Sequence, residues 1–365
     1  MRILICPDKF KGSISAKEVC AALKKGIVDI RSDLDIVLHP LADGGDGSIE
    51  LLKDFIDLTR VEIETLDPLY RTISANYYHS DKAAFIEMAS ASGLVLITEH
   101  ERNPMNTSSY GTGLMIRDAI SRGFKHIYLF IGGSATNDAG IGIAQALGYT
   151  FLDGSGKALA PNGSSLAKIK SIEIPPTNFD SINITVLCDV INPMYGPNGA
   201  AQVYAKQKGA TNDMIDNLDQ GLKNYASVIH DLIREDISNI PGMGAAGAAA
   251  ASLVGLCKAT LEDGFSVISR ETGLVQMMQK ADLVITGEGK IDETSYQGKV
   301  VGNIHHLCEQ YAKPMGIVGG TVEFVQGKLK FQYAVMDIAD NIEDAMSNAY
   351  NYLKEIGYSI ATQLD

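Results

Sequence analysis

The chain has 365 residues and a formal net charge of −13, from 31 basic and 44 acidic residues, which disfavours nucleic acid as a partner. Hydrophobic residues make up 45% and charged residues 21%, the balance of a globular chain rather than a disordered one. The length predicts two domains, or one domain with a large insertion.

Cysteine spacing and the chain's start bear on the compartment. The five cysteines are widely spaced and form no Cys-x-x-Cys pair, so they predict neither a disulfide framework nor a zinc site. The sequence starts at once with a strand-like Arg2–Cys6, and its longest nearly apolar stretch, Ala245–Cys257, is shorter than the ~20 residues of a membrane span. We therefore predict a cytoplasmic protein with no membrane partner.

The amino-terminal part alternates strands with helices. The spacing of Val19, Leu23 and Ile27 predicts a helix over 16–30, with Ser15 and Glu18 as its capping box. The other predicted elements of this part are strands at 3–6 and 36–38, a glycine-rich loop at 42–47 and a helix at 49–56. This order predicts a parallel α/β sheet.

A strand-rich module interrupts the α/β pattern. Three predicted strands, at 61–67, 72–78 and 83–88, indicate mostly antiparallel pairing. The later elements are a helix at 113–122, a strand at 126–131, a helix at 141–147, a strand at 183–188, helical sequence from 213, a strand at 283–286, a helix at 301–311, strands at 315–318 and 333–336, and a terminal helix at 342–356. The predicted fold class is α/β, with a flavodoxin-like or Rossmann-like parallel sheet.

The predicted domains are discontinuous. The α/β nucleotide and catalytic domain takes residues 1–60, 103–148 and 208–365, and a smaller β-rich α/β domain, 61–102 and 149–207, is inserted in it. A cleft between such domains is a usual site for small ligands.

Two familiar nucleotide motifs are tested first. The P-loop pattern is absent, so a Walker-type phosphate site is excluded. Residues 242–247 do fit G-x-G-x-x-G, but they follow a polar segment and Pro241 rather than a buried strand, and helix packing explains their glycines as well. A dinucleotide site is therefore the weaker interpretation.

Four loops, each beside an apolar strand and each with a carboxylate, carry a stronger signal. They are 42–47 with Asp43 and Asp46, 132–140 with Asp138, 188–193 with Asp189, and 286–292 with Glu288 and Asp292. Phosphoryl transfer needs backbone N–H groups for phosphate, carboxylates for Mg²⁺ and for a proton, and a cation for the developing charge. Any one loop could instead be a capped turn, but four together favour this chemistry.

Basic residues near these loops are candidates for anion binding. Lys11 follows the first strand, where open α/β sheets bind ligands, and Lys290 lies in a predicted Gly-Glu-Gly-Lys turn. Arg71 and Lys299 are further candidates, each otherwise a solvated surface charge.

Six ordered blocks of the sequence resemble those of one family, the bacterial type 1 glycerate kinases. The blocks are 7–13, 42–47, 132–138, 188–193 with 196–201, 241–247, and 286–292 with 297–299. The resemblance implies phosphorylation of D-glycerate, with ATP and Mg²⁺ as cofactors and the 2-hydroxyl favoured over the 3-hydroxyl as acceptor. It also implies a flavodoxin-like domain with a smaller inserted domain.

Together, the resemblance and the loop chemistry give a hypothesis for each group of site residues. Asp189, Lys11 and Lys290 are the predicted catalytic residues, with Asp189 as general base, and Asp43, Asp46 and Glu288 are the predicted metal ligands. The predicted ATP-binding residues are Gly132, Gly133, Ser134, Thr136, Asn137, Asp138, Gly287, Gly289 and Asp292. The predicted substrate-binding residues are Lys11, Ser13, Arg71, Asn192, Lys290 and Lys299.

The chain departs from the family pattern at three places, and alternatives stay open. Lys9 replaces the usual serine, Lys290 replaces the usual arginine, and residues 292–295 replace the usual Asp-Ser-Gln-Thr. Lysine at 290 keeps the charge but loses bidentate carboxylate recognition, so this change bears on substrate affinity more than on chemistry. A kinase for another small hydroxy acid, an NAD-dependent hydroxy-acid dehydrogenase and a non-catalytic metabolite sensor are the alternatives. The expected partners are D-glycerate as the small-molecule substrate and, as an alternative that stays open, a second copy of the chain in a homodimer.

Overall fold

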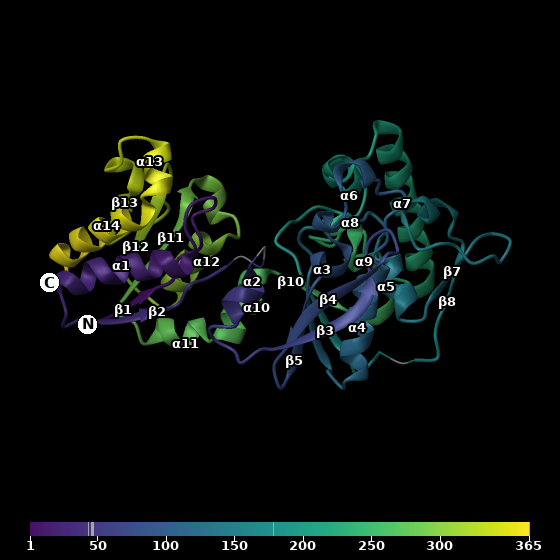
Figure 1. The fold of residues 1–365 in the computed structure, drawn as a ribbon, viewed down its shortest axis with the longest axis horizontal. Coiled ribbons are helices and arrows are strands. Elements are labelled where there is room, and N and C mark those ends of the chain that lie inside the picture. The colour runs from purple at the N-terminus through teal and green to yellow at the C-terminus, as the bar shows by residue number, and fades with distance from the viewer. Residues whose placement is uncertain (43, 45–46, 178, 365) are drawn as a thin grey trace. The chain divides into compact units, whose positions relative to one another are not determined.

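The computed structural model describes residues 1–42, 44, 47–177 and 179–364. It divides into two compact units, one of Met1–Ile56 with Gly264–Asp365 and the other of Asp57–Asp263. We call them the outer unit and the inserted unit and describe each by itself (Figure 1).

The outer unit is built on a five-stranded sheet in which every neighbouring pair is parallel. Its order is β13 (Phe331–Ala334), β12 (Met315–Val322), β11 (Leu283–Ile291), β1 (Arg2–Ile5), β2 (Asp35–Leu38). The chain passes from β1 to β2 on one side and later adds β11 on the other side of β1. The order therefore reverses between β1 and β11, which is the switch point where open α/β sheets bind ligands.

Helices of the outer unit pack on this sheet. Their bounds are α1 (Ala16–Ile30), α2 (Ser48–Leu52), α10 (Gly264–Thr272), α11 (Leu274–Gln279), α12 (Val300–Gln310), α13 (Ile342–Ser347) and α14 (Ala349–Gln363). The capping box of α1 is confirmed: the Glu18 N–H donates to the Ser15 hydroxyl, and the Ser15 N–H donates to the Glu18 carboxylate. Apolar side chains of α1 and α14 share one core with those of β1 and β11.

The inserted unit is built on a mixed six-stranded sheet. Its order is β10 (Thr260–Glu262), β9 (Asn183–Leu187), β6 (His126–Phe130), β5 (Ala83–Glu87), β4 (Thr72–His79), β3 (Thr59–Leu66). The pairs among β3, β4 and β5 are antiparallel, as predicted, whereas β5, β6, β9 and β10 run parallel. A separate antiparallel pair joins β7 (Thr150–Leu152) to β8 (Ser171–Glu173).

The helices of the inserted unit share one large core with this sheet. Their bounds are α3 (Ala89–Ser92), α4 (Tyr110–Ser121), α5 (Ile141–Ala146), α6 (Ala200–Tyr204), α7 (Asn212–Ile233), α8 (Ala245–Ala248) and α9 (Ala250–Cys257). In the part of the chain that the structure describes, no helix has the length and apolarity to cross a membrane. The five cysteines are all free, and only Cys188 among them is not buried.

The α/β class and the parallel sheet are confirmed, but the division of the chain differs from the predicted domains. Residues 103–148 and 208–263 belong to the inserted unit, because strands β6 and β10 extend the same sheet that β3, β4 and β5 begin. The insertion is therefore one continuous segment. It is longer than the outer unit rather than smaller, and helices cover much of its length.

Two predicted elements differ in extent. The Gly-Glu-Gly-Lys segment at 287–290 is not a turn: it continues β11, where Glu288 pairs with Gly319 and Lys290 with Thr321 of β12. The glycines are there because the strands come close: a Cβ on Gly287 would lie 1.8 Å from the carbonyl oxygen of Val318. The predicted terminal helix is two helices, α13 and α14, separated at Asn348.

Candidate functional site

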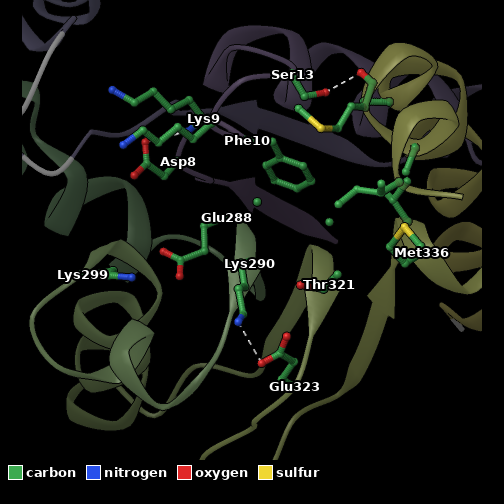
Figure 2. A pocket seen from close by; sticks show the side chains of 18 residues that line it. Asp8, Lys9, Phe10, Ser13, Glu288, Lys290, Lys299, Thr321, Glu323 and Met336 are labelled. Atoms are coloured by element: carbon green, nitrogen blue, oxygen red, sulfur yellow. Dashed lines mark hydrogen bonds and ion pairs between the residues drawn. The ribbon is translucent and has the colours of Figure 1, made fainter.

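A pocket of about 600 Å³ opens in the outer unit at the switch point between β1 and β11. The segment after β1 supplies Asp8 and Phe10, β11 supplies Glu288 and Lys290, and the segment after β13 supplies Met336 (Figure 2). The N–H of Asp8 donates to the carbonyl of Gly287 at 2.8 Å, which holds the segment after β1 against β11.

Two buried carboxylates lie in this pocket. Asp8 is 8% exposed and Glu288 is 6% exposed, and carboxylates are rarely buried without partners. The Asp8 carboxylate accepts from the N–H of Lys9 at 2.6 Å, and the Glu288 carboxylate accepts from the hydroxyl of Ser295. Figure 2 shows Asp8 and Glu288 on the same side of the pocket as Lys9 and Lys299. The pair offers oxygen ligands of the kind that Mg²⁺ prefers.

Lysines surround these carboxylates. Lys9, Lys11, Lys290 and Lys299 all line the pocket. The Nζ of Lys290 lies 3.0 Å from Glu323 and 3.6 Å from Asp292, and the hydrogen bond to Glu323 is the main reason that the pKa of Lys290 is raised. The pocket can therefore hold a ligand with several negative charges.

Two further predicted residues have local partners. The hydroxyl of Ser13, which lines the pocket, donates to the carbonyl of Met346 at 2.6 Å. The Asp292 carboxylate accepts from Thr294, and that side-chain hydrogen bond is the main cause of its lowered pKa. Lys299 donates to the hydroxyl of the same Thr294 at 3.0 Å.

In the inserted unit, three of the glycine-rich segments pack on one another. The N–H of Gly244 donates to the carbonyl of Asn192 at 2.9 Å, and the N–H of Ala139 donates to the carbonyl of Gly247 at 3.1 Å. The segments 132–140 and 188–193 follow the neighbouring strands β6 and β9 at the same edge of the sheet. The sequence blocks 132–140, 188–193 and 241–247 thus form a single cluster.

The glycines of the G-x-G-x-x-G segment are required by this packing. A Cβ on Gly242 would lie 2.8 Å from the Sγ of Cys188, and one on Gly247 would lie 2.2 Å from the carbonyl oxygen of Thr136. Gly247 also has a φ of +72°, in the left-handed region that favours glycine. Packing therefore explains these glycines, and the dinucleotide interpretation gains no support.

The 132–140 loop is exposed at its start and buried at its end. Gly132 and Gly133 are exposed, whereas Thr136, Asn137 and Asp138 are fully buried. The Asp138 carboxylate accepts from the N–H of Ser109 at 2.8 Å, from its hydroxyl at 2.7 Å and from the N–H of Gly142 at 3.3 Å. Burial raises the pKa of Asp138. This carboxylate satisfies backbone donors at the start of α5.

A buried lysine supports the same loop. The Nζ of Lys208 donates to the hydroxyl of Ser134 at 2.9 Å and to the carbonyl of Thr136 at 2.6 Å. Lys208 is 2% exposed, and burial lowers its pKa to about 7. Lys208 was not predicted as a site residue, because Lys206-Gln207-Lys208 has the composition of a surface segment. Asp8 was not predicted either, although its position just after the first strand was a usable signal.

The remaining predicted residues of the inserted unit differ in exposure. Asp189 is exposed directly after β9. The side-chain amide of Asn192 donates to the carbonyl of Asn198 at 2.8 Å and accepts from the Tyr204 hydroxyl at 2.6 Å. Arg71 forms ion pairs with Asp67 and Glu101, and the hydrogen bond that it donates to the Asp67 carboxylate is the main cause of its raised pKa.

The structure thus brings some predicted residues together within each unit. Lys11, Ser13, Glu288, Gly289, Lys290 and Lys299 line the pocket of the outer unit. Asp43 and Asp46 lie outside the described residues. Asp138 and Asp189 belong to the inserted unit, so one cleft shared by Asp43, Asp138, Asp189 and Glu288 stays a prediction.

Comparison with known proteins identifies the family. The sequence model of the glycerate kinase family matches residues 3–365. The chain belongs to the glycerate kinase family. This confirms the resemblance and the prediction of a small-molecule kinase that uses ATP.

Members and relatives of the glycerate kinase family match the chain over nearly its whole length. Glycerate 2-kinase of Escherichia coli K12 is 37% identical over 374 residues, covering 100% of this chain and 98% of that protein. An uncharacterised Synechocystis protein is 45% identical over 328 residues, 89% of this chain and 87% of its own. The solved structure named for glycerate kinase 2 of Salmonella typhimurium LT2 has a TM-score of 0.86 at 38% identity, covering 99% of this chain and 97% of that one.

Proposed function

We propose that the chain transfers the γ-phosphoryl group of ATP to the 2-hydroxyl of D-glycerate, which gives 2-phosphoglycerate. The name of the Escherichia coli relative, which aligns with the whole chain, supports this product over 3-phosphoglycerate. The observation that carries the proposal is the pocket at the switch point, where two buried carboxylates and four lysines line one space. Phosphoryl transfer depends on such positioned charges more than on covalent chemistry.

The donor set of the pocket fits Mg²⁺. This ion is usually held by one or two carboxylates, with waters and substrate phosphates as its other ligands. Asp8 and Glu288 would hold it, with Asp43 and Asp46 as further proposed ligands outside the described residues. When bound, Mg²⁺ neutralises charge on the β- and γ-phosphates.

The lysines of the pocket are proposed to bind the negatively charged groups of the substrates. Lys11 and Lys290 neutralise charge on the phosphates or on the glycerate carboxylate, and Glu323 favours the charged form of Lys290. Ser13 and Lys299 line the same pocket and remain proposed substrate contacts. Arg71 and Asn192 also remain proposals, although each has partners within the inserted unit.

The phosphate-binding residues of the inserted unit are proposed at the exposed start of its loop. Gly132 and Gly133 offer exposed backbone. Ser134 follows them, and its hydroxyl accepts a hydrogen bond from Lys208. Thr136, Asn137 and Asp138 act by shaping the loop. In the outer unit, Gly287 and Gly289 bring β11 close to its neighbours, because a Cβ on Gly289 would lie 3.2 Å from the Cα of Phe10.

Asp189 is the proposed general base. It takes the proton of the glycerate 2-hydroxyl as that oxygen bonds to the γ-phosphorus and the bond from the phosphorus to the β-phosphate oxygen breaks, releasing ADP. In Asp189→Asn we expect kcat to fall at least ~100-fold with a small change in ATP affinity. An unchanged kcat would remove Asp189 from this role.

The test of the proposed function is ADP release by the purified chain with a panel of acceptors. D-glycerate, L-glycerate, glycolate and lactate are compared with ATP and Mg²⁺, and NAD replaces ATP in a parallel set. We expect D-glycerate to give the highest kcat/KM and NAD to give no oxidation. A higher kcat/KM with another acid would favour the alternative function, a kinase for a different small hydroxy acid. Lysine in place of the usual arginine at position 290 is the observation that supports this alternative.

The proposed location of the protein is the cytoplasm, and its proposed assembly is a homodimer.

A further inference from the structure

The pocket of the outer unit has two chemically different halves. Carboxylates and lysines line one half, as described above. The other half is formed by apolar side chains from three segments of the chain, which we call the apolar wall: Phe10, Val335, Met336, Ile342 and Met346. Figure 2 shows Met336 across the pocket from Asp8 and Lys299, with Phe10 between them.

Two residues of the apolar wall are exposed although they are large and apolar. Ile342 is 68% exposed and Met346 is 43% exposed, both on α13. Single exposed apolar residues are common, but a group of them that lines a pocket with charged groups is typical of a ligand site. The apolar wall therefore indicates a ligand that has an apolar part.

The two substrates of the proposed reaction differ in this respect. D-glycerate has three carbons that carry a carboxylate and two hydroxyls, so it has almost no apolar surface to bury on such a wall. ATP has a flat base and a ribose at one end and a chain of phosphates at the other. Its two ends match the two halves of the pocket, because apolar contact favours the base and lysines favour the phosphates.

We infer that the apolar wall binds the nucleoside part of ATP and that the lysine-lined half of the same pocket holds its phosphates. The position agrees with the general rule for parallel sheets, because the pocket lies at the carboxyl ends of β1 and β11, where the strand order reverses. The inference rests on the proposed function for the use of ATP. It adds that the base and ribose of ATP are bound in the outer unit.

The test weakens the wall without adding charge near the phosphates. Ile342→Asn and Met346→Gln are made singly and together, since substitutions at exposed positions cost little stability. Ile338→Asn is the matched control, because Ile338 is also large, apolar and 46% exposed, four residues before Ile342, but does not line the pocket. KM for ATP, KM for D-glycerate and kcat are measured for each.

We expect the double variant to raise KM for ATP at least about tenfold, which corresponds to ~1.4 kcal/mol. KM for D-glycerate and kcat should change less than about twofold, because the proposed glycerate contacts are not side chains of the apolar wall. Ile338→Asn should behave as the unchanged chain. Unchanged KM for ATP in the double variant would overturn the inference, and so would an equal rise in KM for D-glycerate.

A binding measurement separates this inference from the proposed function. Thermal unfolding is followed with ATP, with adenosine and with inorganic tripolyphosphate, which has no base. Adenosine and ATP should protect the unchanged chain more than the double variant, and tripolyphosphate should protect both equally. Equal protection of both proteins by adenosine contradicts the apolar wall. Absence of turnover with D-glycerate contradicts the proposed function but leaves the adenosine result as a test of the wall.

Discussion

The buried carboxylates Asp8 and Glu288 are the residues whose loss should harm the chemistry most. In Asp8→Asn and Glu288→Gln the size of the side chain is kept while the negative charge is lost, so we expect kcat to fall at least ~100-fold. Glu293→Gln is the control, because Glu293 is exposed near the pocket but does not line it. Steady-state kinetics at saturating ATP measure the effect. A kcat in either variant equal to that of the control would remove that carboxylate from the site.

The buried Lys208 should leave a mark on stability as a function of pH. Its pKa is lowered from 10.5 to about 7 by burial, so between these values the unfolded chain binds a proton that the folded chain lacks. Below pH 7 both states carry the proton, and the full cost of burying the charge is present. As the pH rises above 7, stability due to this group increases by up to ~1.4 kcal/mol per pH unit.

Urea unfolding at pH 7, 8 and 9 tests this expectation against Lys208→Met, which keeps a long apolar stem. The free energy of unfolding of the unchanged chain should rise with pH relative to the variant. Parallel curves for the two proteins would show that Lys208 does not titrate in this range.

At the scale of elements, helix α1 and helix α14 touch through glycines. A Cβ on Gly26 of α1 would lie 2.0 Å from the carbonyl oxygen of Lys354 in α14. Alanine is ordinarily the better helix former, yet we expect Gly26→Ala to destabilise the chain by ~1–3 kcal/mol, because the two backbones must move apart.

Chemical denaturation measures this effect, with Gly154→Ala as the control. The nearest atom to a Cβ on Gly154 is the Cγ of Lys170, at 3.8 Å, so its stability should change by less than ~0.5 kcal/mol. A Gly26→Ala variant as stable as the unchanged chain would contradict the close approach of the two helices.

The capping box of α1 allows a second prediction at this scale. Ser15→Ala removes the hydroxyl that accepts from the Glu18 N–H, so we expect a loss of ~1 kcal/mol in the free energy of unfolding. Ser359→Ala serves for comparison, because its hydroxyl bonds within α14 to the carbonyl of Glu355. Equal stability of the two variants would show that the cap contributes nothing.

Local signals explain which elements could be predicted. The bounds of α1 follow from its apolar spacing and its cap, and both are local in the sequence. The extension of β11 through Gly287 and Gly289 could not be predicted, because glycine indicates a turn unless the neighbouring strand is known. The burial of Asp138 and Lys208 depends on contacts with segments far apart in the sequence, so it could not be predicted from local composition.

At the scale of the whole molecule, the inserted unit should fold by itself. Its sheet begins with β3 at one edge and ends with β10 at the other, and its core is drawn from residues within 57–263. We expect a fragment of residues 57–263 to unfold cooperatively in urea. A fragment of residues 57–182, which lacks β9 and β10, is the control and should not. Loss of cooperative unfolding in the longer fragment would show that the unit depends on the rest of the chain.

The domain boundaries show why pairing over long distances escapes sequence reasoning. The change from helical to strand-rich sequence near Arg60 marks the first boundary closely, since the inserted unit begins at Asp57. The return at 264 carries no comparable change, because only the three-residue strand β10 lies between helices α9 and α10. The pairing of β6 with β5 and β9 decides the division, and the sequence did not reveal it.

The most direct test of the account is phosphorus NMR of the product formed by the purified chain from ATP, Mg²⁺ and D-glycerate. One spectrum reports both the transfer and the carbon that receives the phosphoryl group. We expect the resonances of ADP and 2-phosphoglycerate in equal amounts. Formation of 3-phosphoglycerate would contradict the proposed acceptor, and ATP left unchanged beside D-glycerate would contradict the kinase itself.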